Sequence, residues 1–568
     1  MNKIKKIFST DYFAEWALLP VAVCAGGFNE YISCAASVLI AALLIVRVIR
    51  SKQFSLRLNL SALAVGAILL GYLITCAYAI DKGAALEGFL SFMPAALYTL
   101  LLMQGKRDPA QTAESLEYLA LGLGAVSFVL WLIPATAKYF SVAGRLAGFF
   151  QYPNSFALFL TVGLLCALSR EKIRIWDAVI AAALGVLIFL TGSRAVMLIA
   201  AAAVAVTLFF RKGKKIKIIV GASVAVLAAA VLIAAPLLGS TEPFSRVFSF
   251  SFGESTLVGR ILYWRDAMPL LLRYPFGMGY LGYSFIQESV QTGIYSVRFV
   301  HNDILQLALD AGWVPCLLFI AAVVRAIFRK GKPFGYRVII AVILAHSLFD
   351  FDLQFTAVLM TLLLFMDADA GKEVVFVKAR AVAVAAAAFF GIFSAYFAVV
   401  LSTSYFGGYE VSEAMYGSNT ENKLALLRSK TTIREQKQVA DDILKQNKYV
   451  SLTYDANARY YYADGDFEQV IKYKRKAIEA APLSYDVYVD YCEMLIQGIP
   501  LYLQTGDRDS AQICISELLN AADTVEHLDD KLSDLGRMID DQPKTELPSE
   551  IKEYVDYLRA VSENINTN

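Results

Sequence analysis

The segment Val297–Gly312, VRFVHNDILQLALDAG, holds the clearest candidate for catalytic chemistry in the chain. It contains His301, one of only three histidines among 568 residues, followed directly by Asn302 and, within an apolar helix, by Asp310. An imidazole titrates near neutral pH and can therefore take a proton from a hydroxyl group. A histidine at the start of a helix is often only a cap, but the polar segments described next favour a functional role.

Three further segments place an arginine beside an apolar run. They are GRLAGFFQYPN with Arg145 and Asn154, LTGSRA with Arg194, and GRILYWRDAMPLLLRYPFGMG with Arg260 and Trp264. The planar guanidinium stays charged and makes bidentate contacts with phosphate, so these arginines are candidates for binding a phosphate group. Simpler interpretations stay open: Arg145 can reach lipid headgroups, Arg194 can hold a helical hairpin, and Arg260 can belong to an ordinary loop helix.

Another polar group, His346, Asp350 and Asp352, lies in the sequence AHSLFDFDLQF near the end of a short apolar run. These side chains could form a polar wall of the same cavity. The secondary candidates of the chain are Asn154, Trp264, Asn302, Asp310, His346 and Asp350. The seven cysteines include no CxxC pair, and no carboxylate-rich cluster is evident, so we expect no metal ion and no cofactor.

Apolar helices must position these residues. The chain is 57% hydrophobic and 18% charged, with a mean hydropathy of +0.53, whereas a soluble protein carries about 25% charged residues. Runs of ~17–25 apolar residues can each cross a bilayer as a helix. The pattern predicts an all-α polytopic membrane bundle of about thirteen spans, near residues 12–28, 31–49, 58–79, 86–104, 117–136, 154–169, 175–191, 193–210, 216–238, 302–324, 337–351, 353–367 and 381–401.

Basic clusters predict the orientation of this bundle. They precede span one and follow every even-numbered span, so all lie on one side, which the positive-inside rule identifies as cytoplasmic. The N-terminus is then cytoplasmic, with a retained first span. The outer side receives loop 137–153, turn 191–193, the long loop 239–301 and the tail after residue 401. Nearly all candidate residues therefore fall at the outer face of the cytoplasmic membrane.

The chain is expected to divide into a membrane domain, 1–401, and a soluble tail, 402–568. The tail contains 18 Lys and Arg against 29 Asp and Glu, a net charge of −11, while the whole chain carries +2. Such a split is typical of two different environments. We therefore expect the tail to be a separate extracytoplasmic domain.

The tail has the pattern of an α-helical repeat domain. Around 454–496, small and aromatic residues recur at helical spacing, a Gly-Asp turn separates two helices, and Pro482 follows the second. This pattern resembles a tetratricopeptide repeat. Further helices near 433–447 and 508–522 would extend it. Such an array either binds a protein partner or simply packs as a domain.

The four segments together resemble the O-antigen ligase and polysaccharide polymerase superfamily. The resemblance covers roughly residues 140–365 and rests on the order RxxGxxxxPN, TGSRA, GRxxxW with a following PxGxG, and HNDxLQxxxxxG. It implies a multi-span glycosyltransferase fold of the GT-C type. It also implies conserved arginines at Arg194 and Arg260, a further one at Arg145, and a catalytic histidine at His301. Relatives often have glutamate where this chain has the shorter Asp310.

The resemblance implies transfer of a glycan from a polyprenyl diphosphate, with undecaprenyl as the expected lipid. His301 would take the proton of an acceptor hydroxyl while the arginines hold the diphosphate. The acceptor is a glycan, a lipid or a protein, so polymerisation and ligation both remain open. The expected partners are the lipid-linked donor, this acceptor and membrane lipids, with no nucleic acid.

Two other classes of function remain open. A flippase or solute transporter would need binding groups near the bilayer midplane and often shows paired interrupted helices, whereas the polar groups here gather at one face. A membrane-anchored scaffold would use the repeat tail to recruit envelope enzymes, but an anchor does not require arginines and a histidine on one rim. Product analysis separates the first class from a transferase, and deletion of 402–568 separates the second.

Overall fold

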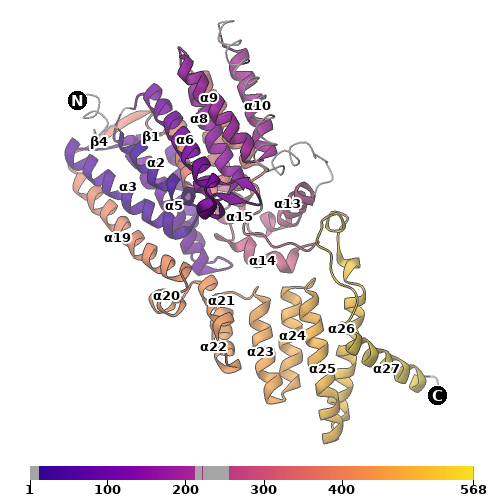
Figure 1. Ribbon diagram of the computed structural model, residues 1–568. Helices are drawn as coiled ribbons and strands as arrows, with labels where there is room; N and C mark the ends of the chain where they lie inside the picture. Colours follow the sequence, from indigo (N-terminus) through magenta and orange to yellow (C-terminus); the bar gives the residue numbers. More distant parts are fainter. Residues whose placement is uncertain (1–11, 106, 212–220, 222–254, 567–568) are drawn as a thin grey trace. The chain divides into compact units, whose positions relative to one another are not determined.

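The computed structural model describes residues 12–105, 107–211, 221 and 255–566 (Figure 1). Its described residues are nearly all helical, as predicted. They fall into two compact units, the first drawn from Met1–Ile74, Leu86–Ser251 and His301–Ser402, and the second from Thr75–Ala85, Phe252–Val300 and Thr403–Asn568. The predicted span at 216–238 and the first part of the 239–301 loop lie outside the described residues.

The first unit is a bundle of apolar helices with two short antiparallel ribbons. Its elements lie wholly or mainly within it and are α2 (Phe13–Val23), η2 (Ala25–Gly27), α3 (Glu30–Ser51), β1 (Phe54–Leu58), α4 (Leu60–Thr75), α5 (Lys82–Met103), α6 (Pro109–Leu132), α7 (Pro134–Phe140), β2 (Ser141–Val142), β3 (Arg145–Leu146), η3 (Gly148–Phe150), α8 (Pro153–Ser169), α9 (Ile175–Leu190), α10 (Arg194–Phe209), α15 (Asp303–Ala311), α16 (Trp313–Phe328), α17 (Phe334–Ser347), η4 (Asp352–Gln354), α18 (Thr356–Phe365), β4 (Lys372–Phe376) and α19 (Arg380–Tyr405).

Four helices of the described chain, α3, α5, α6 and α19, are long and apolar enough to cross a membrane. Eight further apolar helices have 10–17 residues. Helix α19 exposes large apolar side chains, with Phe389 62% and Ile392 73% exposed. Such a surface is unfavourable in water and suits contact with lipid tails. The apolar helices therefore agree with an integral membrane protein.

Helix α8 lies at the centre of the bundle, because all of its side chains from Ser155 to Leu168 are buried. It packs against α6, α9, α10 and α17. Pro153 occupies its first position, where a proline needs no hydrogen-bond acceptor for its missing N–H. This proline places Asn154 in the first helical turn, which is where the candidate site lies.

The predicted span 302–324 differs from the structure, which divides it into α15 and α16 at Gly312. Gly312 has φ 92° and ψ 175°, a backbone conformation that glycine adopts without steric cost and other residues avoid. The two helices have nine and sixteen residues. The histidine segment therefore opens a short helix that ends after two and a half turns.

The β1–β4 ribbon was not predicted from the sequence. Phe54 pairs with Phe376 and Leu58 with Lys372 in antiparallel register. The Arg57 guanidinium crosses this ribbon to Glu373, with Nη2 2.9 Å from Oε2. The two strands are more than 300 residues apart in sequence, and only the packing of the helices between them brings them together.

The second unit joins part of the predicted outer loop to the tail. Its elements are α13 (Ser255–Arg273), α14 (Gly282–Val290), α20 (Tyr409–Met415), α21 (Thr420–Ser429), α22 (Ile433–Leu444), α23 (Ser451–Asp464), α24 (Phe467–Ala480), α25 (Tyr485–Thr505), α26 (Arg508–Glu526), η5 (Leu528–Lys531), η6 (Gly536–Met538) and α27 (Ser549–Asn566). Helices α22 to α26 stand side by side in chain order (Figure 1).

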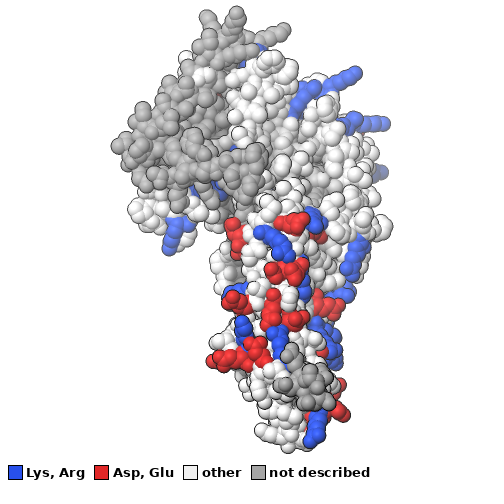
Figure 2. Space-filling model, turned by 90° about the vertical axis from the view of Figure 1, so that its right-hand side faces the viewer, with Lys and Arg blue, Asp and Glu red and all other residues white. Residues whose placement is uncertain are grey.

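The predicted helices of the tail are present. Gly465 ends α23 in a left-handed conformation, and the Asp466 side chain caps α24 by accepting from the backbone N–H of Gln469. This is the expected Gly-Asp turn. Acidic and basic side chains are intermingled over the face of the tail in Figure 2. The helical nature of the tail thus agrees with the sequence, while its tetratricopeptide character and the boundary at residue 401 stay predictions.

Candidate functional site

His301 lies in the first unit, directly before α15. Its backbone has φ 52°, in the left-handed region that few residues other than glycine adopt. The side chain is 21% exposed, and its Nδ1 atom lies 3.1 Å from Oδ1 of Asp350. A buried carboxylate accepts a hydrogen bond from this nitrogen, so we infer that Nδ1 carries the hydrogen and Nε2 keeps its lone pair. His301 is therefore oriented to accept a proton at Nε2.

The carboxylate of Asp350 is fully buried and has several hydrogen-bond donors around it. The Tyr152 hydroxyl donates to Oδ1 over 2.9 Å, and the backbone N–H of Phe351 donates to the same atom over 3.0 Å. The amide of Asn154 donates to Oδ2 over 2.8 Å. A buried anion is tolerated when its lone pairs are satisfied in this way. Asp350 is thus held in one position under His301.

Asn154 connects this carboxylate to an arginine. Its Oδ1 accepts a hydrogen bond of 2.7 Å from Nη2 of Arg145, and the Arg145 Nε donates over 2.7 Å to the carbonyl of Thr191. Gly192 follows with φ 60°, and a Cβ on it would stand 3.4 Å from the Arg145 Nε. The arginine thus lies along the backbone of the LTGSRA turn and is held by protein contacts at both of these atoms.

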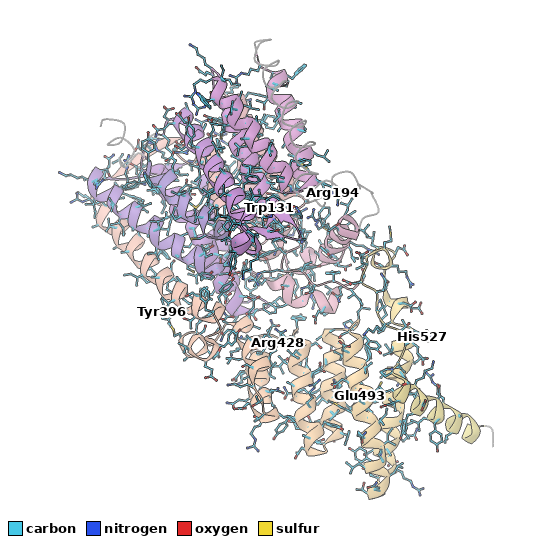
Figure 3. The ribbon with its side chains drawn as sticks, viewed as in Figure 1. Trp131, Arg194, Tyr396, Arg428, Glu493 and His527 are labelled. Carbon is cyan, nitrogen blue, oxygen red and sulfur yellow. The ribbon has the colours of Figure 1, made fainter. Side chains whose placement is uncertain are left out.

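Arg194 begins α10 at the end of the same turn (Figure 3). The turn is short because α9 ends at Leu190 and α10 begins four residues later. Thr191 and Ser193 are buried, whereas Arg194 is half-buried. The structure therefore connects two of the three predicted arginines to one turn, and it connects that turn to His301 through Arg145, Asn154 and Asp350.

Aromatic rings pack beside the histidine. The His301 imidazole makes an edge-on contact with Phe351 at 4.8 Å between ring centroids. Tyr152 packs against Phe351 at 4.8 Å and against Phe355 at 5.8 Å, and Phe28 stacks on Phe355 at 4.7 Å. Phe351 therefore restricts the rotation of the imidazole, and the other rings pack behind Phe351 as an apolar cluster.

His346 belongs to a neighbouring but separate pair. Its Nδ1 lies 2.5 Å from Oδ2 of Asp352, and the Ser155 hydroxyl donates to Oδ1 of Asp352 over 2.7 Å. Both His346 and Asp352 are fully buried. This pair joins α17 to the start of α8 and supports the loop that carries Asp350. These contacts therefore indicate that His346 supports the Asp350 loop.

The remaining candidates of the histidine helix have different positions. The Asn302 side chain caps α15 by accepting from the N–H of Leu305 over 3.0 Å. Asp310 is fully buried and accepts from Gln306 over 2.8 Å and from the Tyr72 hydroxyl over 3.3 Å. Asp310 lies seven residues beyond Asp303, the first residue of α15, which is roughly 10 Å along the helix. It fixes α15 to α4 and does not join the His301 network.

Arg260 and Trp264 lie on α13 in the second unit. They are four residues apart and so share one face of the helix. The Trp264 indole donates over 2.9 Å to the carbonyl of Val300, the residue before His301. Trp264 therefore fixes the chain segment that leads into the histidine.

Sequence reasoning missed three residues of this site. Tyr152 and Phe351 contact Asp350 or His301 directly, and Asp303 accepts from the backbone N–H of Leu353 over 2.8 Å, which holds the Asp350 loop from its other side. Asp303 stands in the motif HND and could have been found there. Tyr152 and Phe351 carry no such signal, because aromatic residues are common at membrane edges.

The arrangement provides an oriented base, a buried carboxylate behind it and arginines at a nearby turn. Such a set can remove a proton from a hydroxyl and bind an anionic leaving group. Among the described residues, no three His, Cys, Asp or Glu side chains gather as a metal site would require.

A family model described as O-antigen ligase matches residues 178–320 of the chain. The matched range contains Arg194, Arg260, Trp264 and His301. A search of curated proteins finds no match. The match supports a role in glycan transfer during surface polysaccharide assembly, which implies a lipid-linked glycan donor and a glycan acceptor at the membrane. Over residues 178–320, the chain is therefore similar to the O-antigen ligase family.

Proposed function

We propose that the chain transfers a glycan from a polyprenyl diphosphate to an acceptor hydroxyl, as a polymerase or ligase of surface polysaccharide. The observation that carries this proposal is the chain of hydrogen bonds from His301 through Asp350, Asn154 and Arg145 to the carbonyl of Thr191. It connects a proton acceptor to the turn that ends in an arginine. The similarity to O-antigen ligases over residues 178–320 supports the same class of reaction.

In this mechanism His301 is the catalytic base. Its Nε2 takes the proton of the acceptor hydroxyl while the hydroxyl oxygen forms a bond to the anomeric carbon of the donor. The bond from that carbon to the diphosphate oxygen breaks, and the electron pair leaves with the diphosphate. A single displacement of this kind inverts the configuration at the anomeric carbon. Asp350 is a positioning residue, because it holds Nδ1 protonated and keeps Nε2 free of hydrogen.

In this proposal the family resemblance assigns Arg194 and Arg260 to the diphosphate, where they would stabilise the charge that grows on the leaving group. The guanidinium groups do so through paired N–H donors, which lysine lacks. Arg145 acts on the same site mainly by holding the LTGSRA turn and Asn154 in place. We place the reaction at the outer face of the cytoplasmic membrane, with the tail on the same side, as the basic clusters predict.

The test is glycan transfer by the purified full-length chain in lipid nanodiscs, with the native lipid-linked glycan as donor and mass spectrometry of the products. General-base catalysis contributes ~10²–10⁴-fold, so His301→Ala should lose most of the rate while the protein stays folded. His527→Ala serves as a matched histidine control, because the His527 side chain is 60% exposed and lies in the tail. Near-normal transfer by His301→Ala would refute the base assignment.

The same assay separates the alternatives. A flippase would move the lipid-linked glycan to the other side of the membrane and leave its length and linkage unchanged. A scaffold would show no transfer as a purified chain. New glycosidic bonds that depend on His301 exclude both.

A further inference from the structure

A row of tyrosines crosses the second unit, from the end of α13 to α23. We name it the tyrosine stripe, and its members in spatial order are Tyr274, Tyr449, Tyr454, Tyr473, Tyr461 and Tyr460. None is fully buried, so each leaves part of its ring open to solvent. The stripe lies outside the His301 network and has no part in the mechanism above.

Contacts join the tyrosines at both ends of the stripe, and Tyr454 lies between them within electrostatic range of Tyr449 and Tyr473. Tyr274 hydrogen-bonds to Tyr449, and burial together with this bond raises the pKa of the Tyr274 phenol to about 12. Tyr461 and Tyr473 stack with ring centroids 5.5 Å apart and planes inclined by 15°. Tyr460 adjoins Tyr461 at 5.4 Å. The stripe thus joins Tyr274, which follows α13, to residues of the consecutive helices α23 and α24 and of the segment before them.

Cations accompany these rings. Lys437 on α22 lies 5.4 Å from the Tyr460 ring centre and 5.7 Å from that of Tyr461, and Lys476 on α24 lies 6.0 Å from both Tyr454 and Tyr473. Three more cations adjoin stripe tyrosines in sequence and lie near their rings, namely Arg273, Lys448 and Lys472.

The local charge differs from that of the tail as a whole. Five cations border the stripe, although residues 402–568 carry a net charge of −11. Carboxylates are also present, since Asp441 pairs with Lys437 at 2.7 Å and Glu479 lies near Tyr454. Lys448, Lys472 and Lys476 are exposed. Open cations beside open aromatic rings provide two kinds of contact on one surface.

These two contacts suit an acidic sugar polymer. The C–H face of a pyranose ring packs on the electron-rich face of an aromatic ring, and a carboxylate or phosphate on the sugar pairs with lysine. Phenol hydroxyls add hydrogen bonds to sugar hydroxyls. Successive aromatic rings provide stacking sites for the successive sugar rings of a polymer, whereas an acidic peptide would need pockets for its side chains or partners for its backbone.

We propose that the tyrosine stripe is a binding surface for an acidic polysaccharide, which holds the acceptor or product chain of the transfer reaction. The proposal rests on the proposed glycan transfer and adds the chemical class of the glycan. It is also supported by position in the chain, because the stripe begins at Tyr274, directly after α13, the helix that carries Arg260 and Trp264.

The test measures binding of polygalacturonate, neutral dextran and polyglutamate to the full-length protein in nanodiscs by biolayer interferometry. The wild-type protein should bind polygalacturonate more tightly than dextran, and polyglutamate at least ~10-fold more weakly than polygalacturonate. Tyr454→Leu with Tyr473→Leu should weaken polygalacturonate binding by roughly 10-fold, while the corresponding Phe variants retain it because they keep the ring. Lys472→Gln with Lys476→Gln should reduce the preference for the acidic polymer and its salt dependence, since two of the five cations are lost.

Tyr485 and Lys544 provide a matched control, because this cation lies 5.4 Å from its ring outside the stripe. Tyr485→Leu with Lys544→Gln should bind polygalacturonate like the wild type. The proposal is overturned if polygalacturonate does not bind, if the stripe variants bind it unchanged, or if polyglutamate binds as tightly. His301→Ala should bind like the wild type, so loss of transfer and loss of polymer binding are distinguishable.

Discussion

The Nδ1 atom of His301 lies 3.1 Å from Oδ1 of Asp350, and the carboxylate is buried beneath the imidazole. This contact determines which ring nitrogen carries the hydrogen. It also connects the histidine to a network that reaches the LTGSRA turn, so the base and an arginine turn depend on the same carboxylate. Changes to Asp350 should therefore affect the reaction without removing any group that touches the substrate.

Asp350→Asn should lower the turnover of glycan transfer by at least ~10-fold with little change in KM. The amide can donate to Nδ1, which favours the tautomer with hydrogen on Nε2, and the base then loses part of the ~10²–10⁴-fold that proton transfer contributes. Steady-state kinetics in nanodiscs measure this effect. Asp350→Glu should recover part of the rate, and an unchanged turnover in Asp350→Asn would show that the carboxylate does not orient His301.

Asn154→Asp should impair transfer more than Asn154→Ala. The asparagine accepts from Arg145 at Oδ1 and donates to Asp350 at Nδ2, so an aspartate would place two carboxylates against each other. Alanine only removes the bridge. The turnover of the two variants measures this order. Arg47→Lys is the control, because Arg47 lies outside the His301 network and donates to the Gln104 carbonyl. Equal activity of the three variants would mean that the bridge has no role.

The sequence was sufficient to predict most of the described apolar helices and to single out several residues that the structure brings together in the candidate site. Repeated apolar runs identify spans because a lipid environment selects for them, and the described helices follow these runs closely. His301, Arg145, Asn154 and Asp350 all stand out as polar residues at the edges of apolar runs. What could not be predicted was their connection, since Asp350 lies 49 residues after His301 and 196 after Asn154. Contacts over such distances depend on how α8, α15 and α17 pack.

Gly312 and Asp310 show why the sequence predicts helices better than it predicts where a helix ends or which side chains are in contact. Gly312 ends α15, but one residue hardly alters the mean hydropathy of a span, so the pattern predicts a continuous helix over 302–324. The sequence also groups Asp310 with His301, because they share one segment. In the structure its carboxylate faces Gln306 and Tyr72 instead, since α15 carries it roughly 10 Å along the helix from Asp303.

Gly312→Ala should destabilise the first unit by about 1–3 kcal/mol. Its φ of 92° and ψ of 175° are costly for a residue with a Cβ. The substitution should also lower transfer, because a straighter α15–α16 would displace Asp303 and the Asp350 loop that it holds. Thermal unfolding in nanodiscs measures the stability. Gly66→Ala is the control, because Gly66 lies inside α4 and a Cβ added there would meet no atom within 4 Å, so it should be neutral or slightly stabilising.

Lys474→Ala should destabilise the tail by about 3–5 kcal/mol, because it leaves two carboxylates without their buried cation. Lys474 is fully buried, its Nζ lies 2.7 Å from Oδ1 of Asp455, and it also pairs with Asp490, so it joins α23, α24 and α25. Hydrogen exchange of peptides from these helices measures the loss. Lys445→Ala removes an exposed lysine paired with Asp442 and should leave the exchange unchanged. If Lys474→Ala exchanged like the Lys445 variant, the buried ion pairs would not hold the three helices together.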